Sequence, residues 1–583
     1  MFQHKKVGEH AMSYIDAFKA NKNLIGVLGE GNAHLIWVLG MYIEDPDLES
    51  LASEALTDGP NDKKIDCIYL DQNSGRIIFA QGYYSTKKKD TAPDNKASDL
   101  NTAAAWLISG NIADVPEQLR SVFQACREAI KEGEVESIEL LYVHNLPESV
   151  NVTKELQTVS THLRGHLGDA SGITVSAREF GQGQIENLFS TRESHIEVKA
   201  EIPCPTKVMF EERGPKWCAS IMTVPGTWLH DLFVKYGEAL FSANYRGFLG
   251  ITKRRKINTG IRLTAESLPK DFWVFNNGIT LLTYKVASVK DGVVLTGVSI
   301  INGAQTTGSI GSVDISRHDL KDVHVLCRII ECSDPETIGD IVKFNNTQNE
   351  ITTWDQYSND ADQGRLESEF NELGHKYSRK RGFRIKCDQI GTEEVAQPLV
   401  AFHGRFQDAN GGKNRVFERK PLYSLAFSGK KARHILFIYT LSRSIDERRI
   451  ELKNKSTEGN IISIEECQLR LLRNLRFKYF FISVIAHVLE TIIGRKVNKD
   501  TVAFSTSAAK IANKSIIELI AAWSPIVEGV LSFLSSQIDS TTFGDKVSED
   551  GTLENISKTV SALLYTTRNN PAYQAFTGLV SDS

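Results

Sequence analysis

Apolar and polar residues along the first 195 positions follow the patterns of an alternating α/β unit. Two short β-branched and aromatic runs, IDCIYL at 65–70 and RIIFAQGYY at 76–84, flank the turn-forming segment DQNSG and predict a β-hairpin. Helical spacing predicts a helix over 32–56, in which Asp47 would cap the segment LESLASEAL. Further helices are expected over 99–109, 115–132, 150–166 and 183–190, with strands over 137–146 and 173–180.

From about residue 200 the pattern changes to strands separated by polar motifs, and then to helices. A helix is predicted over 225–241, strands over 272–283, 293–301 and 323–331, and helices over 334–345, 358–373, 431–448, 465–492 and 507–536. We therefore expect a mixed α/β (α+β) protein with a mostly helical C-terminal region. The expected domains are 1–195, 196–420 and 421–583, and the loop QDANGGKNRVFERKP at 407–421 marks the second boundary.

The composition is that of a soluble globular chain. The 68 Lys and Arg residues against 72 Asp and Glu residues give a net charge of -4, so any nucleic-acid binding must be local. Eight cysteines without a CxxC pair are typical of reduced thiols in the cytoplasm. We predict no signal peptide, because the N-terminal residues contain no apolar stretch followed by a cleavage site. We also predict no membrane span, because the most apolar C-terminal stretch, 479–489, is about half a span long. Motifs of phosphate-binding loops, serine hydrolases and zinc enzymes are missing from the sequence.

The predicted hairpin places two oxygen donors where they can share a metal ion. Asp66 begins the first strand and Gln81 lies in the second, so the carboxylate and the amide oxygen can converge on Mg²⁺ or Mn²⁺. Such a cation would activate water and stabilise charge on a phosphoryl oxygen during phosphodiester hydrolysis. Glu54 from the preceding helix would complete the shell, with Glu30 as the less favoured choice. The alternative is structural, with Asp66 capping a hairpin and Gln81 an ordinary strand residue.

This spacing resembles the restriction-endonuclease-like pattern of Asp, then Glu or Gln, one residue, then Lys. The resemblance implies a lysine that orients the attacking water, but that position here is Tyr83, whose phenol is uncharged at neutral pH. One of the lysines a few residues further along would have to supply the cation, and otherwise we expect weak or absent cleavage. The implied catalytic residues are Glu54, Asp66, Gln81, Tyr83 and Lys87, with Asp66 and Gln81 as metal ligands.

Four polar motifs follow or interrupt apolar runs between 244 and 352. They are NYR, FNNGIT, INGAQTT and NNTQNEIT, and strand ends should bring their amides together. Amides suit the reading of nucleobase edges, but Asn-Gly also suits turns and buried amides satisfy loop backbone. The candidate residues are Asn244, Arg246, Asn276, Asn277, Asn302, Gln305, Thr306, Asn345, Gln348 and Asn349.

Together with KINTGIRLTAESLPKDFWVFNNGIT, VHVLCRIIE and SNDADQGRLESEF leading to KYSRKRG, these motifs resemble the abortive-infection phage-resistance (AIPR) family over about 200–385. The segment DGPNDKKIDCIYLD, followed by IIFAQGYY, is similar to the nuclease-like region that often precedes that domain. The resemblance implies bacterial or phage-borne defence against infection, with a restriction-endonuclease-like N-terminal domain followed by an AIPR-like recognition domain. It also favours Asp66 and Gln81 as metal ligands.

Two basic clusters flank the polar motifs, KRRK at 253–256 and KYSRKRGFRIK at 376–386. Basic side chains bind phosphates, and the interleaved Tyr377 and Phe383 would offer stacking surfaces for unpaired bases. A charge run is more often a plain solvated face, which is the alternative. The residues expected to contact nucleic acid are Lys88, Lys89, Arg254, Arg255, Arg379, Lys380 and Arg381.

Two functions remain open at this point. The first is a metal-dependent nuclease of anti-phage defence, which cleaves DNA or RNA through residues 1–195 and recognises it through 200–420. The second is a nucleic-acid-binding or sensor protein with a degenerate nuclease-like domain, which acts through a partner such as another defence-system protein. A homodimer fits the first function, because nuclease domains of this type commonly pair to cut two strands. Tyr83 favours the second function.

Overall fold

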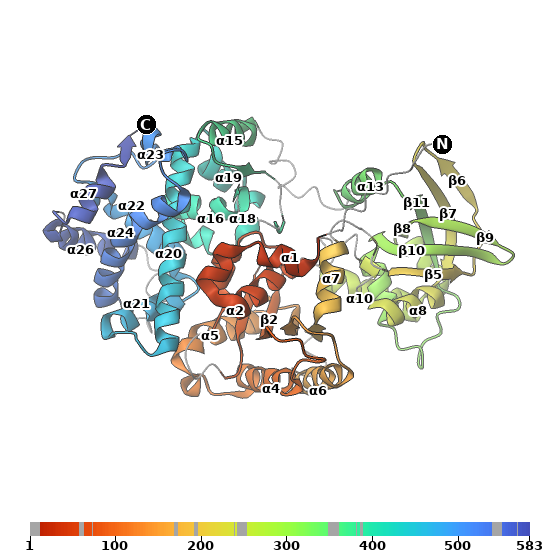
Figure 1. The fold of residues 1–583 in the computed structure, drawn as a ribbon. Coiled ribbons are helices and arrows are strands. Elements are labelled where there is room, and N and C mark those ends of the chain that lie inside the picture. Colours follow the sequence, from red (N-terminus) through yellow and green to blue (C-terminus); the bar gives the residue numbers. More distant parts are fainter. Residues whose placement is uncertain are drawn as a thin grey trace, which may run out of the picture. The chain divides into compact units, whose positions relative to one another are not determined.

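The chain forms two compact units. The computed structural model describes residues 12–57, 63–72, 74–167, 173–191, 196, 198–237, 240–241, 254–347, 361–379, 382–384, 389–538, 551–567 and 569–582. The first unit joins Met1–Ile185 to Thr353–Ser583, and the second is Glu186–Thr352 (Figure 1). The expected mixed α/β class with a helical C-terminal region is confirmed. Most of the segments expected as the first and third domains lie together in the first unit.

The N-terminal part of the first unit is built on a four-stranded sheet in the order β1-β2-β3-β4. β1 (Cys67–Asp71) is antiparallel to β2 (Arg76–Tyr83), which confirms the predicted hairpin. β2, β3 (Ser137–His144) and β4 (Thr174–Phe180) run parallel. Apolar side chains of these strands share a core with α4 (Asp94–Ser109), α5 (Glu117–Lys131) and α6 (Val150–Leu167). Smaller elements are α1 (Tyr14–Lys19), η1 (Ile112–Asp114) and α7 (Gln182–Thr191).

The helix predicted over 32–56 is two helices, α2 (Lys22–Ile43) and α3 (Leu48–Ala55). The chain turns at Glu44, which has a left-handed φ of 56°. Asp47 then starts α3 by accepting a hydrogen bond from the backbone N–H of Ser50 at 3.0 Å, as predicted for this N-cap. The helical spacing of apolar residues therefore continues across a turn between two helices, and the polar residues at 44–47 form that turn.

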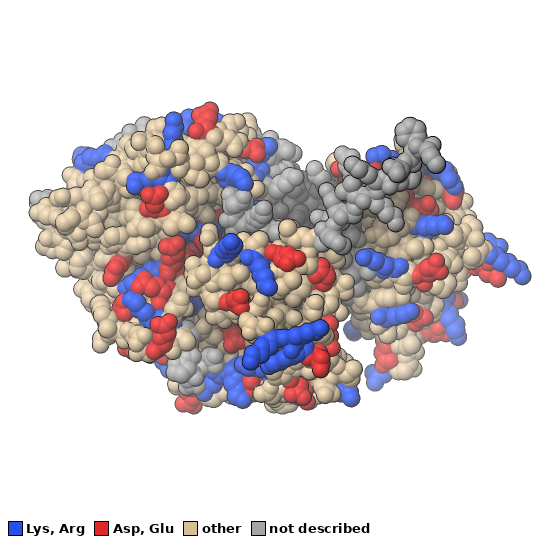
Figure 2. Space-filling view, viewed as in Figure 1, with Lys and Arg blue, Asp and Glu red and all other residues tan. Residues whose placement is uncertain are grey.

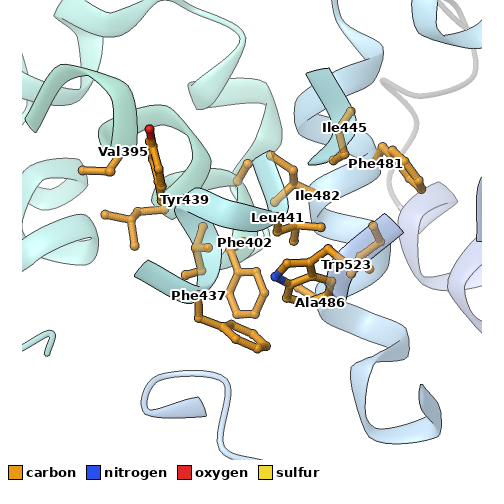
Figure 3. Close-up of a cluster of buried hydrophobic side chains, with 14 of the residues drawn as sticks. Val395, Phe402, Phe437, Tyr439, Leu441, Ile445, Phe481, Ile482, Ala486 and Trp523 are labelled. Carbon is orange, nitrogen blue, oxygen red and sulfur yellow. The ribbon is translucent and has the colours of Figure 1, made fainter. Parts of the chain in front are cut away.

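The C-terminal part of the first unit is helical and holds an extensive hydrophobic core. Phe402, Phe437 and Trp523 are fully buried at its centre, and the Phe437 and Trp523 rings lie 4.7 Å apart (Figure 3). The helices are α15 (Ala361–Glu372), α16 (Thr392–Phe402), α17 (Phe406–Ala409), α18 (Lys413–Glu418), α19 (Lys420–Phe427), α20 (Ala432–Glu458), α21 (Ser463–Arg473), α22 (Phe477–Ile493), α23 (Thr506–Ala509), α24 (Ile516–Gln537), α26 (Thr552–Thr567) and α27 (Pro571–Thr577). Two short pairs complete it, parallel β12 (Tyr377–Ser378) with β13 (Ile390–Gly391), and antiparallel β14 (Val502–Phe504) with β15 (Val580–Asp582).

Two predictions about this region are wrong. The segment 407–421, predicted as a boundary loop, folds largely into α17, α18 and α19 and buries Val416 and Phe417 in the core. Asn410, Gly411 and Gly412 form the turn between α17 and α18. The helix predicted over 465–492 is interrupted between α21 and α22, where the side chain of Asn474 accepts the backbone N–H of Arg476 at 2.9 Å.

The second unit is built on a seven-stranded sheet in the order β5-β10-β8-β11-β7-β6, with β9 paired to β10. The strands are β5 (Val198–Cys204), β6 (Phe210–Arg213), β7 (Trp217–Pro225), β8 (Ile279–Thr283), β9 (Lys285–Val289), β10 (Gly292–Asn302) and β11 (His324–Cys332). The helices are α8 (Gly226–Tyr236), α10 (Arg254–Ser267), α11 (Phe272–Phe275), α12 (Ala304–Gly311) and α13 (Pro335–Thr347), with the 3₁₀ turn η4 (Pro269–Asp271).

The predicted strand over 272–283 is partly wrong, because its first residues form α11 and only the end is β8. The side chain of Asn276 donates a hydrogen bond to the carbonyl of Phe272 at 3.2 Å and closes that short helix. The predicted helix over 225–241 ends at Tyr236, since Gly237 takes a positive φ of 52°. Strands β5, β6, β7 and β9 were not predicted.

Two helices are long and apolar enough to cross a membrane by length and composition, α2 and α24. Both pack within the first unit, α2 against α3 and β2, and α24 against α20, α21 and α26. These contacts are those of core helices in a folded domain.

Candidate functional site

Polar side chains gather at one edge of the four-stranded sheet. Because β2, β3 and β4 are parallel, their carboxyl ends meet there, and the start of antiparallel β1 lies at the same edge. In α/β sheets, ligands bind outside the carboxyl ends of the strands. The residues at this edge, hereafter the sheet-edge site, are Asp66, Gln81, Tyr83, Tyr142, His144 and Glu179.

Asp66 and Gln81, the predicted metal ligands, are in direct contact. Nε2 of Gln81 donates to Oδ2 of Asp66 at 2.6 Å, and the backbone N–H of Gly82 donates to the same oxygen at 2.8 Å. Gln81 is 1% exposed, and its Oε1 has no hydrogen-bond partner among the described residues. A buried acceptor without a partner costs about 1–3 kcal/mol. This amide oxygen is therefore suited to hold a cation or a water molecule.

The oxygen atoms of the sheet-edge site are enough for the minimal set of protein ligands with which Mg²⁺ is usually bound. Proteins usually bind Mg²⁺ through one or two carboxylates, while water and substrate phosphates fill the other positions. Asp66 supplies the carboxylate and Gln81 the amide oxygen. The part of the chain that the structure describes contains no group of three or more His, Cys, Asp or Glu residues arranged around a metal. A cation at this edge would therefore depend on water and substrate for most of its ligands.

Glu54, predicted to complete the shell, belongs to a different group of charges. It lines a small cavity with Arg449, Lys453 and Arg473 from the helical part of the unit. Burial raises the pKa of Glu54, and the nearby Arg449 opposes that shift. The less favoured Glu30 is exposed on α2. The described contacts bring neither carboxylate to Asp66.

A lysine does reach Tyr83, the position where the resemblance implies a cation. Nζ of Lys89 donates to the Tyr83 hydroxyl at 2.6 Å and lies 5.3 Å from the centre of the ring. Lys87 and Lys88 are exposed. The segment leading to these lysines is held by Asn145, which accepts from the backbone N–H of Ser85 at 2.9 Å and donates to its carbonyl at 2.8 Å.

Sequence reasoning missed the buried pair of His144 and Glu179. Nε2 of His144 lies 3.0 Å from Oε1 of Glu179, and its Nδ1 accepts from the backbone N–H of Leu146 at 3.3 Å. These two contacts place the ring proton of His144 on Nε2 and fix the orientation of the ring. His144 pairs with Tyr83 in the register of β2 and β3, so its ring lies beside that residue. The signal was present, because the strand SIELLYVH ends in a histidine and the strand TVSAREF carries a glutamate near its end.

Two of the polar motifs of the second unit, FNNGIT and INGAQTT, lie next to each other at the ends of β8 and β10. Asn302 at the end of β10 pairs in register with Thr280 in β8. A Cβ atom at Gly303 would lie 3.0 Å from the carbonyl oxygen of Gly278, so the FNNG and INGAQ segments touch. The two segments are therefore neighbours through their backbones, and the convergence of their side-chain amides stays a prediction.

Two of the amides in these motifs have clear structural partners. Nδ2 of Asn276 donates to Oγ1 of Thr264 at 3.0 Å, and Nδ2 of Asn345 donates to the carbonyl of Ile341 at 2.8 Å. Asn277 is exposed. Gln305 is half-buried and Thr306 is buried. Four candidates lie outside the described residues, Asn244, Arg246, Gln348 and Asn349.

A comparison with protein families finds a match in the central part of the chain. Residues 241–531 match the family model described as AIPR protein. These residues, hereafter the AIPR region, are similar to the AIPR family. The match begins about 40 residues after the start of the 200–385 resemblance and continues past its end into α24. It supports an anti-phage abortive-infection role. No curated protein and no solved structure matches the chain.

The basic cluster of the AIPR region differs in part from the prediction. Tyr377 and Phe383 are only 5% and 6% exposed, so the expectation that their rings stack on nucleobases is wrong. Tyr377 stacks on Phe370 in the core. Arg379 pairs with Glu367 at 2.8 Å. Lys380 and Arg381 lie outside the described residues, and Arg254 and Arg255 lie in the first turn of α10.

Charge on the described surface is mixed. On the face drawn in Figure 2, basic and acidic side chains lie among one another. This agrees with the net charge of -4, and nucleic-acid binding would have to use a local surface.

Proposed function

We propose that the protein is a cytoplasmic, Mg²⁺- or Mn²⁺-dependent nuclease of anti-phage defence. The sheet-edge site would hydrolyse phosphodiester bonds of DNA or RNA, and the AIPR region would recognise the nucleic acid. The observation that supports this most is the contact of Asp66 with Gln81 at the same edge as the Tyr83–Lys89 pair. A carboxylate, an unpartnered amide oxygen and an ammonium group are the group types that metal-dependent phosphodiester hydrolysis needs.

Each side chain has a distinct role in this proposal. A bound divalent cation would stabilise charge on the phosphoryl oxygens and activate the attacking water. Asp66 and Gln81 would hold that cation. Because Lys89 donates to the Tyr83 oxygen, the phenolic hydrogen remains available for a water or a phosphate oxygen. The pair therefore combines a positive charge with a hydrogen-bond donor.

The first test is whether the full-length chain cleaves plasmid, single-stranded DNA or RNA only when Mg²⁺ or Mn²⁺ is present. Metal-dependent cleavage that EDTA abolishes is the expected result. The absence of cleavage on all three substrates would contradict the nuclease function.

Lys89→Gln is expected to lower the cleavage rate by at least about tenfold, equivalent to roughly 1.4 kcal/mol of barrier. The reason is that the substitution removes the ammonium group on Tyr83 while keeping a polar side chain. The measurement is the single-turnover rate at saturating Mg²⁺. Lys131→Gln removes the same charge from an exposed residue of α5 and should change the rate by less than about twofold. Equal losses in both variants would argue for non-specific attraction of the substrate.

A second function is favoured by one observation. Oδ2 of Asp66 already accepts two hydrogen bonds from the chain itself, so this oxygen is satisfied without a metal. In this function the sheet-edge site is degenerate, and the protein binds nucleic acid and acts through a second copy of itself or another defence-system protein. It predicts nucleic-acid binding that is insensitive to EDTA and unaccompanied by cleavage.

Nucleic-acid recognition by the AIPR region can be tested through its basic cluster. Replacing Arg379, Lys380 and Arg381 by Gln should lower the slope of log affinity against log salt by up to about three phosphate contacts. The matched control replaces three exposed lysines elsewhere in the first unit, Lys131, Lys496 and Lys558. It removes the same net charge and should leave the slope nearly unchanged. Equal slopes for the two triple variants would show that Arg379, Lys380 and Arg381 do not contact phosphates and belong to an ordinary solvent-exposed surface.

A further inference from the structure

Two exposed histidines stand one turn apart near the end of α6. The Nε2 atoms of His162 and His166 lie 3.0 Å apart, and the two rings meet edge to face with centroids 4.5 Å apart. An i, i+4 pair lies on one face of a helix, so both imidazoles can reach the same point in solvent. Neither residue takes part in the sheet-edge site or in the AIPR region.

The separation of the two nitrogen atoms suits a transition metal. Metal–imidazole bonds are about 2.0–2.1 Å long. At a nitrogen separation of 3.0 Å, such bonds subtend an angle of about 90°, which is the angle of tetragonal Cu²⁺ and Ni²⁺ sites. Tetrahedral Zn²⁺ would need the nitrogen atoms about 3.3 Å apart. The separation of the two nitrogen atoms therefore matches a tetragonal cation.

A neighbouring helix fixes the ring of His162. Its Nδ1 lies 2.8 Å from Oδ1 of Asn101 on α4, and because an amide oxygen only accepts, Nδ1 carries the proton. The lone pair of Nε2 is then directed toward His166 and solvent. Metal-binding histidines usually donate their other N–H to an oxygen in this way, which fixes the tautomer and the ring orientation.

We propose that His162 and His166 form a binding site for Cu²⁺ or Ni²⁺ that is separate from the sheet-edge site. Both ligands bind as neutral imidazoles through Nε2, and His166 carries its proton on Nδ1 in the bound form. Water occupies the remaining positions, because the site faces solvent. Asn101 is a positioning residue that acts through His162. The bound ion stabilises the helical conformation of the last turn of α6.

Cu²⁺ titration of the full-length chain, prepared without a histidine tag, tests this proposal. Calorimetry should show one site per chain whose affinity falls at least about tenfold in His162→Ala and in His166→Ala. Asn101→Ala should weaken binding by about 10–100-fold through loss of the positioning hydrogen bond. His324→Ala removes an exposed histidine from the second unit and should leave the site intact.

Electron paramagnetic resonance gives a second readout that does not depend on affinity. The Cu²⁺ spectrum of the unmodified chain should show coupling to two imidazole nitrogens, and each His→Ala variant should show one at most. Cu²⁺ should also raise the unfolding temperature of the unmodified chain and not of the variants, since it binds only the folded pair. Binding that survives both substitutions, or a spectrum with a single nitrogen in the unmodified chain, would overturn the proposal.

Discussion

Asp66→Asn is expected to lower Mg²⁺-dependent cleavage by at least about a hundredfold, the scale on which removing one charge-stabilising group acts. Asparagine is nearly isosteric, and its amide oxygen can still accept the hydrogen bonds from Gln81 and Gly82. The fold of the hairpin should therefore persist while the carboxylate proposed to hold the metal is lost. Cleavage rates at saturating substrate, together with Mg²⁺ binding by calorimetry, measure the effect.

The complementary substitution Gln81→Glu sharpens this test. It places a second carboxylate against Asp66, at the position where the amide now donates at 2.6 Å. Without metal the two carboxylates repel each other in a buried position, so the variant should unfold at a lower temperature than the unmodified chain. Mg²⁺ should recover more stability in this variant, because two carboxylates bind a hard cation better than one.

Two results would count against the metal site. Asp66→Asn that cleaves like the unmodified chain would show that the carboxylate has no part in hydrolysis. Gln81→Glu that unfolds at the same temperature with and without Mg²⁺ would show that the two side chains do not share a cation. If both variants still bind nucleic acid normally, the degenerate binding function is favoured.

The sequence predicted the parts of the fold that depend on local patterns. The hairpin followed from two β-branched runs around a turn, and the later strands and helices of the N-terminal part lie within a few residues of their predicted positions. The unpredicted strands β5 and β6 are largely exposed, so they lack the alternation of a half-buried strand. The segment FWVF reads as a strand by composition, but Asn276 closes it as a helical turn.

The candidate site was predictable only in part, for a similar reason. Asp66 and Gln81 meet because hairpin register follows from the sequence, and Lys89 reaches Tyr83 across six residues. Glu54 was assigned to this site from its nearness in sequence. Its charged neighbours in the fold lie near residue 450, almost 400 positions away. One-dimensional patterns carry no information on such contacts.

The same long-range contacts give the largest expected effect on stability. Arg443→Met is expected to lower the free energy of unfolding by about 3–5 kcal/mol, the usual cost of removing one partner of a buried ion pair. Arg443 of α20 is 5% exposed, contacts Asp47 at the start of α3 and donates to Glu394 of α16 at 2.6 Å. Methionine fills similar space but removes the guanidinium group that both buried carboxylates share. Urea unfolding at pH 7 measures the change.

The control for this substitution is Arg213→Met, in which an exposed arginine loses a 2.8 Å pair with Glu211. Surface pairs contribute about 0–1 kcal/mol, so the control should stay within that range. A loss in Arg443→Met as small as that of the control would contradict the structural role of the buried pair.

The dependence on pH provides an independent check of the Arg443 ion pair. Arg443 holds the pKa of Asp47 below its usual value despite burial. A depressed carboxyl pKa adds stability above the unfolded value of about 3.9, and this contribution is lost as the pH falls toward the folded value. In Arg443→Met the buried carboxyl groups lose the positive charge of Arg443, so their pKa values rise. Protonation at low pH then reduces the free-energy cost of keeping them buried. The difference in unfolding free energy between the two proteins should therefore narrow from pH 7 to pH 4. A difference that stays constant over this range would show that the buried carboxylates are not stabilised by Arg443.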